Sequence, residues 1–209
     1  MTETVLATAY LPNILYFAII AQKKKIRIEH HETYLKQTFR NRTTILSANG
    51  PLDLTIPIVR TNGNHTQTSE IQIAYSEKWQ IRHWRAIVSA YNASPFFLYY
   101  QDELEEMLMD KHETLMDLNG KLLSLLIKKL KIECEISFTE DYCPILGKQD
   151  LRIAISPKKD MKKLALYEPY EQVFSTKLPF EPNLSILDLL FNIGPESRDY
   201  LLNKIRLMY

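Results

Sequence analysis

The residues best suited to chemistry lie in a short basic segment between positions 34 and 42. If this segment is extended, alternate side chains share one face. That face would carry Tyr34, Lys36, Thr38, Arg40, Arg42 and Thr44. Crowded cations favour a negative group among them. Because a guanidinium fork matches phosphate or carboxylate and lysine adds a point charge, the segment predicts a binding site for an anionic group.

A second interpretation of the same cations stays open. Lys36, Arg40 and Arg42 can be solvated or can pair with acids of the same chain. The internal acids available for pairing include Glu29, Glu32 and Asp53. Exposed charges are commonly solvated and add little to stability. The local pattern therefore does not by itself separate a ligand site from internal ion pairs.

Positions 78–94 form the second candidate, because their pattern predicts a helix. On that helix Arg82 and Arg85 line up with Ser89, and His83 lies one turn after Trp79. A histidine titrates near neutral pH, so His83 is the candidate general acid or base. The alternative is a histidine that is packed and hydrogen-bonded beside two tryptophans.

Several common kinds of site are excluded by the sequence. The glycines are too scattered for a dinucleotide fingerprint or a P-loop, and they occupy positions 50, 63, 120, 147 and 194. His30, His31 and Glu32 are adjacent, and adjacent residues of a strand point to opposite faces. We therefore expect no metal site, and the sequence leaves any cofactor unidentified.

The composition is that of an ordinary globular protein. The chain has 209 residues, 26 basic and 25 acidic side chains and a formal net charge of +1. Near-neutral charge argues against nucleic acid as a partner. The apolar run over 10–21 is too short to span a bilayer, and the lysines that follow it do not suit a signal peptide. With only Cys134 and Cys143, we expect reduced thiols and a cytoplasmic location. Because no linker divides the chain, we expect one domain over residues 1–209.

The periodicity predicts an α/β fold: a mixed sheet with an N-terminal βαβ-like unit and a hairpin, packed against several helices. Asn49-Gly50 is a strong hairpin signal between two β-favouring runs. The predicted strands cover 5–9, 26–29, 44–46, 52–56, 71–75, 134–138 and 151–155. The predicted helices cover 13–22, 78–94, 95–109, 115–130, 185–191 and 196–207.

The sequence resembles the WbqC-like protein family over most of its first 130 residues. The resemblance is carried by Tyr10-Leu11-Pro12, the Phe39-Arg40-Asn41-Arg42 block, Leu54-Thr55-Ile56-Pro57-Ile58, His83-Trp84-Arg85, the stretch from Tyr91 to Tyr100 and Leu118-Asn119. The tail over 184–197 is similar to the branch of the family found in Bacteroidetes. One departure is Asn13, where the family is expected to carry tryptophan.

The family takes its name from a member encoded among O-antigen biosynthesis genes. The resemblance implies a cytoplasmic protein that modifies or handles activated sugars. Together with the cationic face and the neighbouring histidine, it favours a transferase that moves an acyl or aminoacyl group onto a nucleotide-activated sugar. His83 would then be catalytic, and a small phosphate- or carboxylate-bearing ligand would contact Tyr34, Lys36, Arg40, Asn41, Arg42, Trp84, Arg85 and Tyr91. The alternative is a non-catalytic ligand-binding or scaffold protein that acts as a homodimer.

Overall fold

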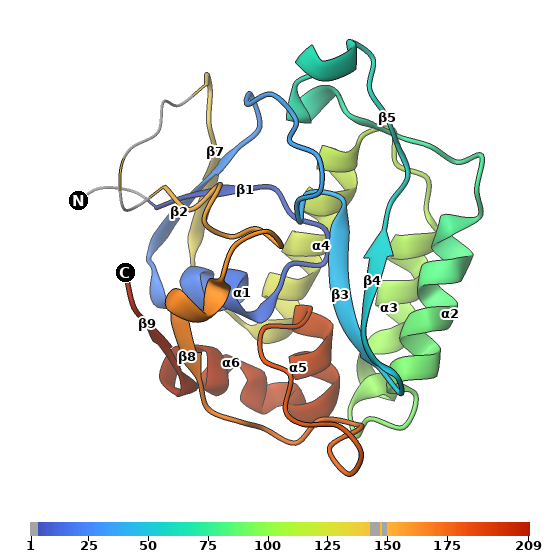
Figure 1. Ribbon diagram of the computed structural model, residues 1–209, viewed down its shortest axis with the longest axis vertical. Helices are drawn as coiled ribbons and strands as arrows, with labels where there is room; N and C mark the ends of the chain where they lie inside the picture. The colour runs from blue at the N-terminus through green and yellow to red at the C-terminus, as the bar shows by residue number, and fades with distance from the viewer. Residues whose placement is uncertain (1–3, 143–146, 148–149) are drawn as a thin grey trace.

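The first sheet is parallel and has the strand order β1-β2-β7 (Figure 1). The computed structural model describes residues 4–142, 147 and 150–209. Strand β1 (Thr4–Ala7), helix α1 (Ile14–Gln22) and strand β2 (Lys25–Glu29) follow one another, and the two strands pair in parallel. Strand β7 (Glu135–Phe138) pairs in parallel with the other side of β2. The predicted βαβ unit and the predicted strand over 134–138 are confirmed.

Helix α1 is buried on every side rather than along one face. All residues from Ile14 to Ile20 are buried, and helix α5 (Ile186–Ile193) and strand β9 (Ile205–Leu207) pack against it. This apolar run therefore fills the hydrophobic core, which contains residues from Leu6 to Ile205. Within the described parts of the chain, no helix is long and apolar enough to cross a membrane.

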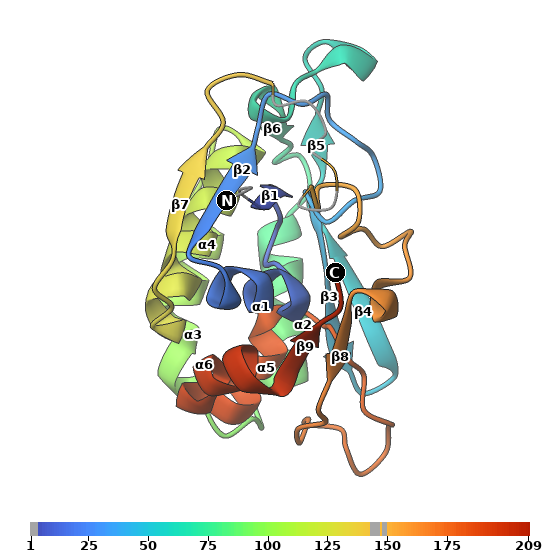
Figure 2. The ribbon, with the colours of Figure 1, turned by 90° about the vertical axis from the view of Figure 1, so that its left-hand side faces the viewer.

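The predicted hairpin is confirmed and lies on the opposite side of the molecule from β7 (Figure 2). Strands β3 (Arg42–Ser47) and β4 (Gly50–Thr55) pair antiparallel, and Ser47 faces Gly50 across the turn. Gly50 has a φ of 105°, which side chains disfavour, so a glycine suits this end of the turn. Strand β3 packs against α5 and against helix α2 (Trp79–Tyr91).

Two further helices follow α2. Helix α3 (Phe97–Met109) begins two residues after the predicted start at Pro95, because the Phe96 N–H donates to the Phe191 carbonyl oxygen at 3.0 Å and Phe96 stays outside the helix. Helix α4 (Leu115–Leu130) has the predicted bounds and is capped by the Thr114 side chain. The described residues also form three short strands: β5 (Ile58–Val59), β6 (Gln72–Ile73) and β8 (Ala165–Tyr167). Short helical turns lie at Gly63–His65, Thr68–Glu70, Met161–Lys163, Gly194–Glu196, Ser197–Asp199 and Tyr200–Lys204.

Two predictions about the C-terminal part are wrong. The segment 151–155 forms turns rather than a strand, because Leu151 and Ile155 are buried at a spacing of four while Ile153 is 49% exposed. The predicted helix over 196–207 ends at Lys204, and β9 then pairs antiparallel with β8. This pairing joins segments about forty residues apart, which local periodicity does not reveal. Cys134 is a partly buried free thiol, and Cys143 lies outside the described residues.

Two glycines with the same φ give a test of the packing at the end of α5. Gly194 and Gly63 both have a φ of 51°, but a Cβ at Gly194 would lie 2.5 Å from the Phe96 ring, whereas nothing lies within 4 Å at Gly63. We expect Gly63→Ala to cost about 1 kcal/mol of backbone strain. Gly194→Ala should cost about 2–4 kcal/mol because overpacking adds to that strain.

Urea denaturation followed by far-ultraviolet circular dichroism measures both free energies of unfolding. Equal losses for the two variants would contradict this description of the contact between Gly194 and Phe96.

Candidate functional site

A cluster of buried charges lies at the carboxyl ends of β1 and β2, the edge of a parallel sheet where ligands commonly bind. The structure brings together Glu29, Glu32, Arg40, Asp150 and Arg152, which we call the charge cluster. The Arg40 and Arg152 side chains are only 2% and 3% exposed. Arg152 Nη1 lies 2.9 Å from Glu29 Oε2, and its Nε donates to Asp150 Oδ1 at 2.9 Å. Arg40 Nε donates to Glu32 Oε1 at 3.0 Å.

Backbone and side-chain contacts hold three members of the cluster in place. Glu29 is the last residue of β2 and accepts hydrogen bonds from the His31 N–H and the Thr139 hydroxyl at 2.8 and 2.9 Å. Asp150 forms a parallel β-bridge with Val5, on the side of β1 that does not pair with β2. The Arg40 carbonyl oxygen accepts a hydrogen bond of 2.8 Å from Asn119 Nδ2 on α4.

The electrostatics of the cluster do not favour the binding of a further anion. Burial raises the pKa of the Glu32 carboxyl above its ordinary value, and the nearby Arg40 offsets only part of this effect. Hydrogen bonds to Asp150 raise the pKa of Arg152, with a further contribution from Glu29. When every group is ionised, the three carboxylates outnumber the two guanidiniums of the cluster. A neutral polar group therefore suits this position better than a further negative charge.

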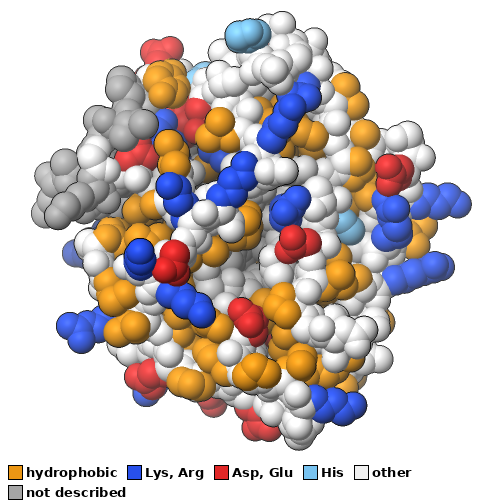
Figure 3. Space-filling model, viewed as in Figure 1, with side chains coloured by type: hydrophobic (Ala, Val, Ile, Leu, Met, Phe, Trp, Pro, Cys, Tyr) orange, Lys and Arg blue, Asp and Glu red, His pale blue; other side chains and the backbone are white. Residues whose placement is uncertain are grey.

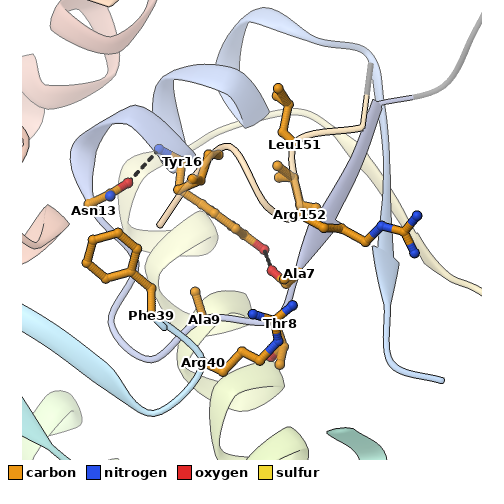
Figure 4. Close-up of a pocket in the computed structure, with 11 residues that line it drawn as sticks. Ala7, Thr8, Ala9, Asn13, Tyr16, Phe39, Arg40, Leu151 and Arg152 are labelled. Carbon is orange, nitrogen blue, oxygen red and sulfur yellow. Dashed lines mark hydrogen bonds between the residues drawn. The ribbon is translucent and has the colours of Figure 1, made fainter. Parts of the chain in front are cut away.

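Arg152 contributes to the lining of two cavities. The inner one, about 10 Å³, has room for about one water molecule. It lies beneath the loop after β1, where Arg40 comes close to Thr8 and the Tyr16 hydroxyl donates to the Ala7 carbonyl oxygen (Figure 4).

The outer cavity is about 400 Å³ and open. Its lining residues are His31, Glu32, Thr33, Leu35, Tyr142, Arg152 and Ile153. Because Glu32 and Arg152 belong to this lining, a ligand in the outer cavity can reach the charge cluster.

The backbone N–H groups in the first turn of α1 all donate to oxygen atoms of the protein itself. The Ile14 N–H donates to the Leu184 carbonyl oxygen at 2.9 Å, and the Leu15 N–H donates to Asn183 Oδ1 at 2.8 Å. The Tyr16 N–H donates to Asn13 Oδ1 at 3.0 Å. Since these first-turn donors are occupied, the usual way for a helix N-terminus to bind phosphate is closed here.

The predicted extended face over 34–44 is wrong in its geometry. The chain bends at 36–38 and turns at 39–40, and Gln37 has a left-handed φ of 57°. Arg40 therefore enters the charge cluster, while Arg42 Nη1 pairs with Asp53 at 3.4 Å and Lys36 is exposed. The internal ion pairs that the sequence left open are present at both arginines.

Tyr34 and Asn41 join this segment to the end of the hairpin. The Tyr34 hydroxyl donates to Asn41 Oδ1 at 2.8 Å, and Asn41 Nδ2 donates to the Ile56 carbonyl oxygen at 2.8 Å. Burial raises the pKa of Tyr34 to about 12. Both residues hold the basic segment against the hairpin, and their predicted contact with a ligand stays a prediction.

The predicted site residues of α2 have other partners. His83 Nδ1 lies 2.9 Å from the Tyr10 hydroxyl, and its ring meets Trp79 edge-on at 5.2 Å. Trp84 stacks on Phe97, and Arg85 is exposed.

Tyr91 is fully buried in the core. Its hydroxyl donates to Asp188 Oδ1 at 3.0 Å and accepts from the Leu46 N–H at 3.1 Å. Of the predicted site residues, Arg40 alone lines the cavity shown in Figure 4.

Sequence reasoning did not identify the other members of the charge cluster as site residues. Glu29 and Glu32 are recognisable from the sequence only as possible partners of the basic segment. Asp150 and Arg152 lie in or beside a segment predicted to be a strand, and their spacing matches no known site motif. Only the tertiary bridge between Asp150 and Val5 brings them to the sheet.

With this fold and site in view, comparison with known proteins defines the class. The chain belongs to the WbqC-like protein family, whose family model matches residues 8–165 and 160–200. It is 29% identical over 221 residues to "Uncharacterized protein Rv1507c" of Mycobacterium tuberculosis, an alignment that covers 92% of this chain and 94% of that protein. No solved structure matches this chain. The resemblance to the Bacteroidetes branch stays a prediction.

The buried imidazole of His83 predicts a measurable pH dependence. Burial lowers the pKa of His83 from its ordinary 6.5 to about 4. The unfolded chain therefore binds this proton more tightly, so the free energy of unfolding decreases as the pH falls from 6.5 to about 4. At roughly 1.4 kcal/mol per pH unit, the contribution of His83 is about 3 kcal/mol.

Urea denaturation at several pH values measures this slope. We expect His83→Gln to flatten it and the exposed control His65→Gln to leave it unchanged. The same slope in all three proteins would show that His83 is not held neutral by burial.

Proposed function

We propose that this WbqC-like protein is a cytoplasmic transferase of surface-polysaccharide biosynthesis of the O-antigen type. It moves an acyl or aminoacyl group onto a nucleotide-activated sugar. The observation that carries the proposal is the Glu32 carboxylate, which is buried beside Arg40 and also lines an open cavity of about 400 Å³. The gene context that gives the family its name supports the substrate class.

The chemistry follows from a carboxylate whose pKa lies above its ordinary value. A hydroxyl or amine of the sugar attacks the carbonyl carbon of an activated ester or thioester. Glu32 takes the proton from the attacking atom as the new bond forms, and then returns it to the leaving group as the old bond breaks. Arg152 lines the same cavity, but its guanidinium is paired with Asp150 and Glu29, so in this proposal it acts as a positioning residue beside Glu32.

This proposal changes the distribution of roles among the predicted site residues. Glu32 replaces His83 as the proposed proton carrier, because Glu32 lines the open cavity whereas His83 hydrogen-bonds to the buried Tyr10. Arg40 acts as a positioning residue that holds Glu32. The ligand contacts predicted for Lys36, Arg42, Trp84, Arg85 and Tyr91, and the catalytic role of His83, stay predictions.

Replacing the carboxylate separates binding from chemistry. We expect Glu32→Gln to lower the transfer rate by roughly 10²- to 10⁴-fold, the usual contribution of a general base. Substrates should still raise its melting temperature, because the amide keeps the shape of the side chain. The exposed Glu77→Gln is the matched control, since Glu77 forms an ion pair with Arg82 at the surface.

The substrate screen combines UDP-, dTDP- and CDP-linked sugars with coenzyme A thioesters and inorganic phosphate. Thermal shift detects binding, and mass spectrometry detects acylated product. A wild-type transfer rate in Glu32→Gln would remove Glu32 from the mechanism. A melting temperature that no compound changes would contradict the proposal as a whole.

A non-catalytic protein that works as a homodimer remains the second candidate. Leu98 and Tyr99 on α3 are 71% and 77% exposed. Exposed apolar side chains of this kind favour contact with a second copy of the protein. Size-exclusion light scattering on the same samples checks this candidate: a monomer that turns over substrate excludes it. We also propose that residues 1–209 form one domain, which the shared core between Leu6 and Ile205 supports.

A further inference from the structure

A second open cleft lies between the hairpin and the C-terminal part of the chain, and we call it the hairpin cleft. It measures about 390 Å³, a size typical of small-molecule sites. It is lined by Phe39, Thr44, Pro51, Asp53, by parts of segment 157–167, and by residues 181–184. Figure 3 shows the face as hollowed near its centre, with acidic and basic side chains around the hollow.

The hairpin supplies the ordered polar side of the cleft. Asp53 on β4 accepts a hydrogen bond of 2.7 Å from the Thr44 hydroxyl through Oδ1. Its Oδ2 lies 3.4 Å from Arg42 Nη1. The Asp53 carboxylate is therefore oriented before any ligand arrives, yet half of its side chain remains exposed and can accept further hydrogen bonds.

The opposite side offers aromatic and apolar surface with one unsatisfied hydroxyl. Phe39 forms part of the wall, and Met161 and Pro182 add apolar atoms. The Tyr167 hydroxyl is buried and has no hydrogen-bond partner among the described residues. This hydroxyl oxygen has almost no accessible surface, so Tyr167 contributes to the lining through its other atoms and its hydroxyl is assigned no ligand contact.

The charges of the cleft identify the kind of ligand. Lys159 and Lys162 are exposed, while Asp53, Asp160 and Glu181 supply carboxylates to the same lining. The two lysines can pair with one anionic group such as a diphosphate, and the three carboxylates leave no surplus of positive charge for a longer polyanion. The lining suits a ring that carries many hydroxyls and has one apolar face, because carboxylates accept hydroxyl hydrogens and an aromatic wall covers the apolar face.

We propose that the hairpin cleft binds the hexose ring of a nucleotide-linked sugar, with the diphosphate near Lys159 and Lys162. The substrate class rests on the proposed function, while the site itself rests on the cleft. Phe39 lines both this cleft and the inner cavity at Arg40, whereas the outer cavity at Glu32 shares no lining residue with the cleft.

Binding measurements on surface variants test this site. The probes are UDP-N-acetylglucosamine, dTDP-glucose and GDP-mannose, each compared with its nucleotide alone, by isothermal titration calorimetry and saturation-transfer NMR. We expect saturation of the hexose protons and a Kd at least tenfold higher in the double variant Thr44→Val/Asp53→Asn. Tyr167→Phe should bind as the wild type because the Tyr167 hydroxyl is inaccessible, and so should the exposed Asp102→Asn on α3.

The outcomes separate this site from the proposed reaction. Binding that depends on Thr44 and Asp53, without transfer from any acyl donor, supports the cleft and contradicts the transferase. Wild-type affinity in Thr44→Val/Asp53→Asn, with an unchanged melting temperature, overturns the cleft and leaves the role of Glu32 standing. No binding of any of the three probes by the wild type also overturns the cleft.

Discussion

The ion pairs of Arg152 are the interaction on which the candidate site depends. Arg152 pairs with Glu29 at the end of β2 and with Asp150 beside β1, so one side chain joins the sheet to the segment that follows β7. Buried charges require such partners, because an unpaired charge in the interior is strongly destabilising. The same pairing leaves Glu32 with Arg40 as its ion-pair partner in the described structure, and burial raises the pKa of Glu32 although Arg40 offsets part of this effect.

A second buried carboxylate organises the other half of the molecule. Asp188 on α5 accepts hydrogen bonds from Tyr91 and Tyr170 and from Gln172 Nε2 at 2.8 Å. Burial raises the pKa of Asp188 above its ordinary value. Because the Tyr91 hydroxyl also accepts from the Leu46 N–H, this group fixes the hairpin relative to α5. The position of the hairpin in turn sets the width of the hairpin cleft.

Local patterns in the sequence predict the elements whose structure depends on near neighbours. The parallel βαβ unit, the turn at Gly50 and the bounds of α4 all follow from short-range spacing and turn chemistry. Segment 151–155 and the end of the chain are predicted wrongly because their structure depends on contacts with distant strands.

The candidate site is predictable only in part, for the same reason. Arg40 is identified from its neighbours, and its pairing with Glu32 is one of two interpretations that the sequence leaves open. Arg152 reaches the cluster through a bridge to β1 across more than 140 positions, which no local spacing encodes. The alternation rule also fails over 34–42, because a left-handed residue, Gln37, breaks the extended geometry that the rule requires.

The central claim is that burial holds the Glu32 carboxyl ready to exchange a proton in an open cavity. The most direct measurement is a ¹³C NMR titration of the glutamate side-chain carboxyls in the wild type and in Glu32→Gln. This account predicts a carboxyl resonance that titrates above the ordinary glutamate value of 4.5 and disappears in the variant. If every glutamate titrates at or below that value, Glu32 is an ordinary ion-pair partner of Arg40 and the proposed acid–base role is wrong.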